Sequence, residues 1–358
     1  MEYKRLGDYI RPVDVRNWDL KVNLSQGICN AKYFQNPKQV ADNPETHKVV
    51  RTGQFAYNRA TTRNGEKISI ALREGPDCTV SSAYQVFEIA DENLLHPKYL
   101  MMWFKRPEFD RLAIYYSHGS AHEFFEWDTM CEVKLPIPSI TRQREIVLEY
   151  ETLTNRIRLN NQMIQNLEAT AQALYRKTFV DNIDKEKLPE GWRMGTLGEV
   201  ATFKYGKLAE KHEKSFEYPY PVFSGYAITG YTNEYTLEDP TIVIIARGDA
   251  GTGRICMSPS KCFLSNLAIS IEPKERFLKE YLYYYLLDSD TMSLRSGSAQ
   301  AQITINNVEP FEIMIPSRDV CLDFSHKFAT LYDNIIVYKR EIEILTELQS
   351  LLLAKMGR

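Results

Sequence analysis

The chain has 358 residues, a length that predicts about two domains. Hydrophobic residues make up 44% and charged residues 25%, which excludes a disordered or low-complexity chain. Lys and Arg number 44 against 47 Asp and Glu, so the net charge of −3 excludes a uniformly basic nucleic-acid binder but not local basic patches. The six cysteines form no CxxC pair, which argues against a zinc knuckle and predicts reduced thiols.

No apolar run reaches the roughly 18–20 residues that cross a bilayer. The charged start, Met1–Leu6, is not followed by the apolar stretch of a signal peptide. We therefore expect a cytoplasmic protein without a membrane partner.

The first part of the chain, residues 1–141, is predicted to be mostly β. Val49–Tyr57 and Ile68–Leu72 are strand-like, and Gln85–Ile89 partly alternates between apolar and polar residues. A short helix is predicted over residues 97–116.

A long helix is predicted next, within residues 142–180. Its apolar residues recur mostly at spacings of three and four, which is typical of a coiled-coil stripe; they are Ile146, Tyr150, Leu153, Ile157, Ile164, Leu167, Ala171 and Leu174. Asn160 is either a polar seam residue that sets the pairing register or an edge residue without a special role.

Residues 181–192 are predicted to be a linker, because Pro189 and Gly191 break a helix. A second β-rich part follows over residues 193–318. In it Thr241–Ile245 is predicted to be a buried strand, Ala268–Ile271 alternates, and residues 275–292 form a short helix. A second long helix lies within residues 319–358, with the stripe Phe324, Phe328, Leu331, Ile335, Tyr338, Ile342, Leu345 and Leu352.

The chain repeats itself. Leu153 matches Leu331 and Ile164 matches Ile342 at an offset of 178 residues. The same offset relates Gly119–Ala121 to Gly297–Ala299, and Leu135–Pro138 to Ile313–Pro316. The predicted fold is α+β, with two β-rich domains separated by two long antiparallel coiled-coil helices in a pseudo-twofold internal repeat.

Loop segments with several Lys, Arg and amide side chains are candidates for nucleic-acid contacts, because DNA is read by such side chains placed at a groove. In the first β-rich part the candidates are Arg51, Gln54, Tyr57, Asn58, Arg59, Arg63, Asn64 and Lys67. The alternative for this segment is a solvated hairpin with ordinary surface residues.

In the second β-rich part the candidates are Lys204, Tyr205, Lys207, Ser224, Arg247, Arg254, Asn266 and Gln300. Lys204–Lys207 is either a phosphate-binding loop or a solvated loop. Arg247 either faces a groove or pairs with Asp249 or another acid. Gln300 and its counterpart His122 follow the repeated Gly-Ser-Ala turn. Because this turn recurs in both halves, a structural role is the alternative to a DNA contact.

Surplus apolar residues on the long helices could hold a protein partner. The candidates are Leu174, Tyr175, Phe179, Leu351 and Leu352. The alternative is that these residues belong to the core between the helices.

No complete catalytic constellation is present. The chain lacks an Asn-Pro-Pro-Tyr methyltransferase motif, a GxxxxGK[ST] phosphate loop and an HExxH metal site. Gly248–Gly253 follows a strand but lacks the GxGxxG order, so it is predicted to be a strand-connecting loop. We predict that the chain is not an enzyme and binds no cofactor or metal.

These features resemble one known family. Leu188–Trp192 with Leu197–Val200 resembles the usual opening of a target-recognition domain, and Ile137–Pro138 and Ile315–Pro316 resemble its usual close. Leu167–Lys177 resembles the family's central conserved region. In this order, over essentially the full length, the chain resembles the specificity (S, or HsdS) subunit of type I restriction-modification systems.

The resemblance implies a non-catalytic subunit that binds double-stranded DNA. Each target-recognition domain would read one half of a bipartite, asymmetric site, and the helices would set the spacer. Two adenine methyltransferase (M) subunits and restriction/translocase (R) subunits would be the partners. Those partners would supply the sites for S-adenosylmethionine, ATP and Mg.

The repeat and the helix length support the same interpretation independently, but in less detail than the resemblance. A repeated unit suits two half-sites, and a helix of about 38 residues is about 57 Å long, which exceeds one turn of B-DNA of about 34–36 Å. The alternative is a scaffold with two β-rich modules on a coiled-coil spacer and no role at DNA. A stand-alone enzyme is disfavoured by the missing motifs.

Overall fold

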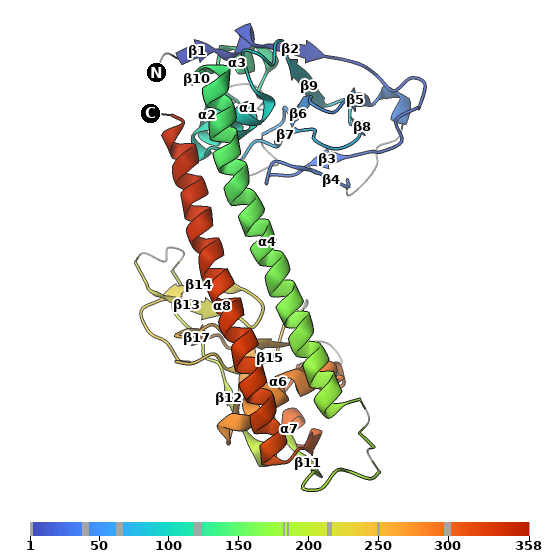
Figure 1. Ribbon diagram of the computed structural model, residues 1–358, viewed down its shortest axis with the longest axis vertical. Coiled ribbons are helices and arrows are strands. Elements are labelled where there is room, and N and C mark those ends of the chain that lie inside the picture. The colour runs from blue at the N-terminus through green and yellow to red at the C-terminus, as the bar shows by residue number, and fades with distance from the viewer. Residues whose placement is uncertain are drawn as a thin grey trace. The chain divides into compact units, whose positions relative to one another are not determined.

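The computed structural model describes residues 3–37, 43–61, 67–117, 124–181, 183–184, 186–212, 217–248, 251–296 and 302–357. The chain divides into two compact units (Figure 1). Unit 1 comprises Met1–Asn161 and Arg340–Arg358, and unit 2 comprises Gln162–Lys339. The hydroxyl of Tyr3 donates to the carbonyl of Gly357, so both ends of the chain meet in unit 1.

Unit 1 is built around a four-stranded antiparallel sheet in the order β2-β9-β6-β7. Its strands are β2 (Ile10–Val13), β9 (Tyr84–Ile89), β6 (Phe55–Asn58) and β7 (Ile70–Leu72). Three antiparallel pairs join β1 (Tyr3–Arg5) to β10 (Lys134–Pro136), β3 (Gly27–Ile28) to β4 (Phe34–Gln35), and β5 (Lys48–Val50) to β8 (Cys78–Val80). Its helices are η1 (Leu6–Asp8), η2 (Pro44–Thr46), α1 (Pro97–Phe104), α2 (Pro107–Ser117) and α3 (Trp127–Glu132).

Aromatic side chains form much of the core of unit 1. Phe55 stacks on Phe87 at 4.9 Å between ring centroids, and both rings meet Phe104 of α1 edge-on. The helix predicted over residues 97–116 is two helices, because Pro107 disfavours helical geometry at the residue before it. α2 therefore forms a separate helix that begins at Pro107.

Unit 2 has a four-stranded antiparallel sheet in the order β12-β18-β15-β16. Its strands are β12 (Ala201–Tyr205), β18 (Ala268–Pro273), β15 (Ile242–Ile245) and β16 (Ile255–Met257). A second sheet holds β14 (Ile228–Thr232), β13 (Tyr220–Phe223) and β17 (Phe263–Leu264), and β11 (Arg193–Thr196) pairs with β19 (Glu312–Ile315). The shorter helices are α5 (Leu197–Val200), η3 (Arg276–Leu278), α6 (Lys279–Asp288), η4 (Thr291–Leu294) and α7 (Ile305–Val308).

The sequence repeat is confirmed in the topology. The order β2-β9-β6-β7 of unit 1 recurs as β12-β18-β15-β16 in unit 2, and the β1–β10 pair recurs as β11–β19. The long helices α4 (Ile140–Phe179) and α8 (Arg318–Lys355) begin 178 residues apart, which is the offset of the sequence repeat. The predicted α+β class with two long helices is therefore confirmed.

Within unit 1 the α4 and α8 segments run antiparallel. Arg156 of α4 contacts Glu341 of α8, whereas Leu148, nearer the start of α4, lies in one groove with Leu352 near the end of α8. Asn160 is only 2% exposed. The alternative that it lies at the edge of the helix pair is therefore wrong, and it is a polar residue of the buried seam.

Candidate nucleic-acid interface

Four strand ends meet at one end of the main sheet of unit 2. Tyr205 of β12 pairs with Ile269, Ile245 of β15 pairs with Ala268, and Ile244 pairs with Ile255 of β16. The antiparallel register therefore brings three loops together, whose described residues are 206–207, 246–248 with 251–254, and 265–267. We call this region the unit 2 sheet end.

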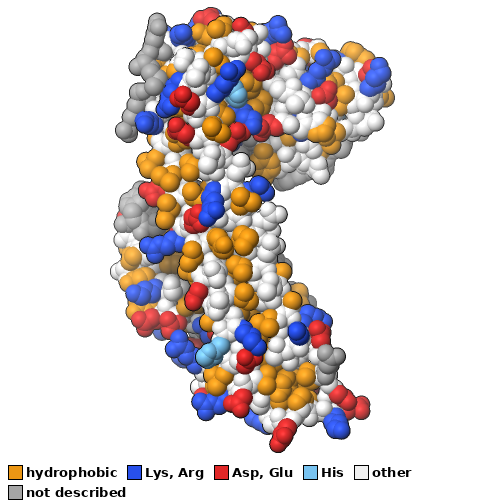
Figure 2. Space-filling view, in the orientation of Figure 1, with side chains coloured by type: hydrophobic (Ala, Val, Ile, Leu, Met, Phe, Trp, Pro, Cys, Tyr) orange, Lys and Arg blue, Asp and Glu red, His pale blue; other side chains and the backbone are white. Residues whose placement is uncertain are grey.

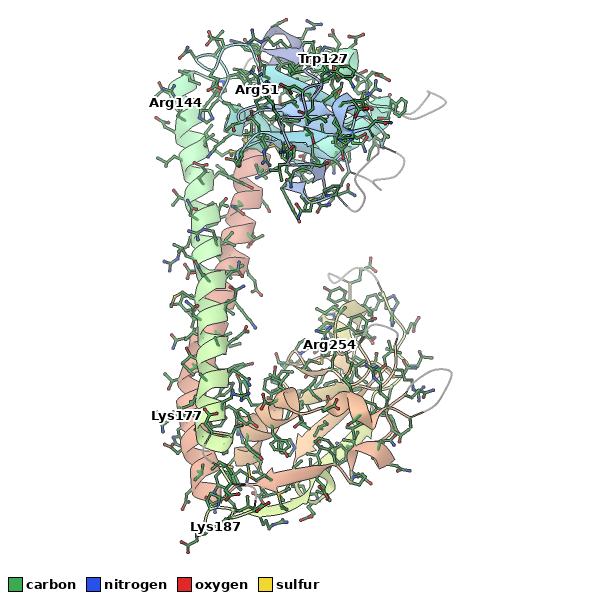
Figure 3. All side chains as sticks on the ribbon, turned by 90° about the vertical axis from the view of Figure 1, so that its right-hand side faces the viewer. Arg51, Trp127, Arg144, Lys177, Lys187 and Arg254 are labelled. Carbon is green, nitrogen blue, oxygen red and sulfur yellow. The ribbon has the colours of Figure 1, made fainter. Side chains whose placement is uncertain are left out.

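The unit 2 sheet end carries exposed basic and amide side chains. They are Lys207, Arg247, Arg254 and Asn266. Among the residues that the structure describes, none of these four side chains has a hydrogen-bond or ion-pair partner. Asp249, the acid weighed as a partner for Arg247, lies outside the described residues. Figure 3 shows Arg254 on the side of unit 2 away from Lys177 and Lys187.

The loop between β15 and β16 is held in place by its neighbours. The Thr291 hydroxyl donates to the carbonyl of Gly253, and the Arg295 guanidinium donates to the carbonyl of Thr252. Gly248 and Gly253 have φ of +126° and +94°, which favour glycine. The loop joins two antiparallel strands, so its prediction as a strand-connecting loop is confirmed.

Other candidates in unit 2 already have structural partners. Lys204 pairs with Glu272 at 3.1 Å, and the Tyr205 hydroxyl accepts a hydrogen bond from the backbone N–H of Ile305. Ser224 is fully buried and its hydroxyl donates to the carbonyl of Ala227, so its assignment as a DNA contact is wrong. Gln300 lies outside the described residues.

Unit 1 has an equivalent region at the same end of its repeated sheet. β6 ends at Asn58, paired with Tyr84 at the start of β9, and Arg59 follows directly. Lys67 lies before β7 and is exposed. The N–H of Phe125 donates to the carbonyl of Arg59, as the N–H of Ile303 donates to that of Ala246 in unit 2. We call this region the unit 1 sheet end.

The unit 1 sheet end carries the cations Arg59 and Lys67, of which Arg59 has an acidic partner. Arg59 pairs with Glu126 at 3.3 Å and lies over the ring of Phe124. Burial lowers the pKa of Lys48, and the carboxylate of Asp14 opposes this effect. The positive charges of Arg16 and Arg59 lower the pKa further. Arg59 and Lys48 are therefore within electrostatic reach of each other.

The predicted segment from Arg51 to Lys67 does not form one surface. Arg51 and Gln54 precede β6, whereas Arg59 follows it, and four strand residues span about 13 Å. Gln54 accepts from the N–H of Arg51 and donates to Glu88. The Gln54 side chain is therefore bonded to the turn and to β9, and its bond to Glu88 lowers the pKa of that carboxyl.

Two further candidates of unit 1 have structural roles. Tyr57 is fully buried in the aromatic core, so its assignment as a DNA contact is wrong. The side-chain Oδ1 of Asn58 accepts a hydrogen bond from the N–H of Ala60. Arg63, Asn64 and His122 lie outside the described residues.

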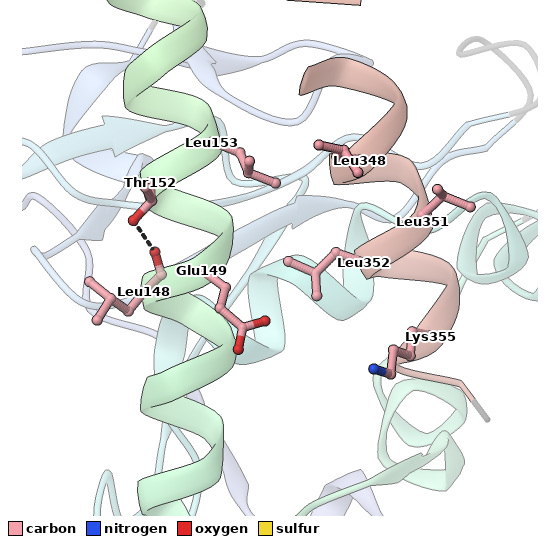
Figure 4. Close-up of a pocket in the computed structure, with 8 residues that line it drawn as sticks. All are labelled: Leu148, Glu149, Thr152, Leu153, Leu348, Leu351, Leu352 and Lys355. Atoms are coloured by element: carbon pink, nitrogen blue, oxygen red, sulfur yellow. Dashed lines mark hydrogen bonds between the residues drawn. The ribbon is translucent and has the colours of Figure 1, made fainter. Parts of the chain in front are cut away.

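A second surface lies on the helices of unit 1. Leu148, Leu153, Leu348, Leu351 and Leu352 line an open groove of about 600 Å³ between α4 and α8, with Glu149, Thr152 and Lys355 at its margin (Figure 4). Leu148 is 66% and Leu351 59% exposed. Figure 2 shows apolar side chains exposed over these helices.

The partner-binding residues predicted on α4 do not share that exposure. Tyr175 and Phe179 are 2% and 1% exposed, and they pack with Tyr281 and Phe324 inside unit 2. Leu174 packs against the same cluster. The assignment of Tyr175 and Phe179 to a partner surface is wrong, because the aromatic core of unit 2 covers them, whereas Leu174 is half-buried and its assignment stays a prediction.

Sequence reasoning missed two exposed features. Leu148 and Leu348 extend the groove, and the spacing Leu348, Leu351, Leu352 was its signal. Trp18 is 69% exposed on a loop whose base is closed by the Asn17 amide, which bonds both the N–H and the carbonyl of Val22. Nothing in the local pattern distinguishes Trp18 from a core tryptophan.

The described part of the chain shows no cluster of three or more His, Cys, Asp or Glu side chains that could hold a metal ion. Within the same residues, no helix is both long and apolar enough to span a membrane.

Comparisons with known proteins agree with this architecture. Residues 189–337 match the family model described as "Type I restriction modification DNA specificity domain". The MjaIX specificity subunit of Methanocaldococcus jannaschii is 24% identical over 72% of this chain and 68% of that protein. The HindI specificity subunit of Haemophilus influenzae is 21% identical over 98% of this chain and 97% of that protein.

The fold is also shared with a solved structure. The crystal structure of the type I restriction-modification S subunit from M. genitalium aligns over 100% of this chain and 96% of that one, with a TM-score of 0.62 and 17% identity. Fold, internal repeat and sequence similarity agree: residues 189–337 match the type I restriction modification DNA specificity domain, and the chain is similar over most of its length to specificity subunits of type I restriction-modification systems.

Proposed function

We propose that the chain binds duplex DNA through the two sheet ends, one in each unit, and that each reads half of an asymmetric site. The observation that carries this proposal is the repeat. The same end of the same four-stranded sheet carries basic side chains in both units. They are the half-exposed Arg59 and the exposed Lys67 in unit 1, and the exposed Lys207, Arg247 and Arg254 in unit 2.

The chemistry of these side chains suits DNA. Arg and Lys bind phosphates and pair with guanine, and Asn pairs with adenine, so Asn266 adds an adenine-reading group to unit 2. The two sheet ends differ in sequence, so the two half-sites should differ. The net charge of −3 predicts weak, salt-sensitive binding by the chain alone.

The groove of unit 1 is proposed to dock an amphipathic helix of a methyltransferase subunit. Its apolar lining fits the apolar face of a helix, and Glu149 and Lys355 can pair with flanking charges. In this proposal two methyltransferase subunits and the restriction subunits bring the sites for S-adenosylmethionine, ATP and Mg. The complex works in the cytoplasm, where the chain contributes recognition and no catalysis.

The proposed domain boundaries follow from the same interpretation of the chain as a DNA-recognition subunit. We propose that residues 1–141 and 193–318 are the two target-recognition domains. The spacer helices would then lie within residues 142–180 and 319–358, with residues 181–192 as the linker. The scaffold hypothesis has no comparable support, since it leaves the repeated basic sheet ends without a role.

The test is a map of N6-methyladenine made with the full complex. R247A/R254A should reduce methylation, or relax one half of the motif, by on the order of tenfold, because each base contact provides about 1–3 kcal/mol of discrimination. R59A/K67A should affect the other half.

K177A/K187A is the matched control, since it also removes two positive charges from unit 2 but leaves the sheet end intact. Maps unchanged by both sheet-end variants, with the complex still assembled, would favour the scaffold over DNA recognition.

A further inference from the structure

A buried lysine lies at the tip of the β3–β4 hairpin in unit 1. Lys32 has a φ of +65°, a left-handed conformation that is strained for a residue with a side chain. The N–H of Lys32 donates to the carbonyl of Cys29, and that of Cys29 to the carbonyl of Tyr33, which closes the turn. The Lys32 side chain is only 5% exposed, so the strained turn places a cation inside the unit.

The cation has a complete set of partners. Lys32 Nζ lies 2.8 Å from Asp110 Oδ1, donates to the carbonyl of Phe104 at the end of α1, and lies over the ring of Phe109. The side chain of Asp110, on α2, is 10% exposed. The same Oδ1 atom accepts a hydrogen bond from the backbone N–H of Ile68 at 3.1 Å.

Stability alone does not explain this arrangement. Desolvation of two charges usually offsets their attraction, and replacement of a buried ion pair by apolar side chains is often neutral or stabilising. Burial lowers the pKa of Lys32, which reflects that cost. Backbone strain and a buried charge together favour a role in geometry.

The position of the pair indicates which geometry it sets. Ile68 directly follows Lys67 of the unit 1 sheet end. The Ser69 hydroxyl donates to the Asn30 side chain of the same hairpin, and the N–H of Asn58 donates to the carbonyl of Ser69. The hairpin is thus tied to the backbone between Lys67 and β7, and through it to the end of β6.

We propose that Asp110, whose buried negative charge Lys32 neutralises, is a positioning residue that holds the backbone at Ile68, and with it Lys67, for contact with the half-site read by unit 1. This inference rests on the proposed function. Lys67 also lies close enough for its charge to lower the pKa of Lys32. In the described residues of unit 2 every ion pair is between side chains at least 30% exposed, so that part of unit 2 shows no buried pair equivalent to Lys32–Asp110.

Two double variants separate positioning from stability. K32M/D110L and K32M/D110N both remove the ion pair, but only the Asn variant keeps an oxygen that accepts from Ile68. Both are expected to unfold near the wild-type temperature. In the full complex, K32M/D110L should lose on the order of tenfold in selectivity at the half-site affected by R59A/K67A, whereas K32M/D110N should keep it. The other half-site is the internal control.

A milder variant covers the case in which the double variants fail to fold. S69A removes only the hydroxyl bond to Asn30 and should weaken selectivity at the same half-site by a smaller factor. The proposal is overturned if folded K32M/D110L and K32M/D110N have the same methylation map, if both half-sites fail together with a lowered unfolding temperature, or if S69A leaves the map unchanged. A methylation map left unchanged by R59A/K67A would instead refute the proposed function.

Discussion

The hydroxyl of Tyr99 donates a hydrogen bond to the carbonyl of Pro136 at 2.9 Å. The equivalent tyrosine of unit 2, Tyr281, makes the same bond to Met314. Burial raises the pKa of Tyr99 to about 12, and it raises the pKa of Tyr281 as well. In both units the bond ties a short helix to the strand that leads into a long helix, so the repeat extends to individual hydrogen bonds.

Removal of this hydroxyl should destabilise each unit. Y99F or Y281F leaves a carbonyl without its buried partner, which costs about 1–3 kcal/mol of unfolding free energy. Denaturant titration measures this change. Y115F is the control, because Tyr115 is 73% exposed and its loss should change stability by less than about 0.5 kcal/mol. Equal stabilities of Y99F, Y115F and the wild type would contradict a role for the bond.

The two ends of β6 should differ in their effect on DNA binding. R59A removes a cation from the unit 1 sheet end and should weaken DNA binding by the full complex, with a salt dependence reduced by about one unit in slope. R51A removes an exposed cation at the opposite end of the strand and should change neither quantity. Binding isotherms at several salt concentrations measure both, and a larger effect of R51A would place the interface at the other end.

The leucine groove should control assembly. L351E places a charge in the apolar groove and should abolish co-purification of the methyltransferase subunit, while the chain stays folded because Leu351 is mostly solvent-exposed. L94E makes the same change at a leucine of unit 1 that does not line the groove. Assembly that survives L351E as well as L94E would show that the partner docks elsewhere.

The pairing of α4 and α8 in unit 1 should weaken in acid. The Arg156 guanidinium, with smaller contributions that include Asn160, lowers the pKa of Glu341 below its usual 4.5. A carboxylate whose pKa falls on folding stabilises the fold above its unfolded pKa, and this contribution is lost as pH falls through the folded pKa.

The comparison of wild type with E341Q tests this. Unfolding temperatures of the two proteins should differ at pH 7 and converge as the pH falls through the lowered folded pKa of Glu341, and high salt should also reduce the difference. A gap that stays constant down to acidic pH would rule out the ionised Glu341 as its source.

The sequence by itself determined the order of the elements, both long helices and the internal repeat. These depend on the spacing of apolar residues along one segment, and on matching of one segment to another, both of which are local properties. The linker and the break at Pro107 are local too, although Pro107 was not used to divide the predicted helix.

Only the tertiary structure decided which polar residues face solvent together. Tyr57 and Ser224 carry hydroxyl groups and were candidate DNA contacts, yet strand direction and neighbouring elements bury them. Arg51 and Arg59 are eight residues apart but lie at opposite ends of a strand. Lys32 and Asp110 form one buried pair from distant segments. Such relationships depend on contacts between elements, which local periodicity does not encode.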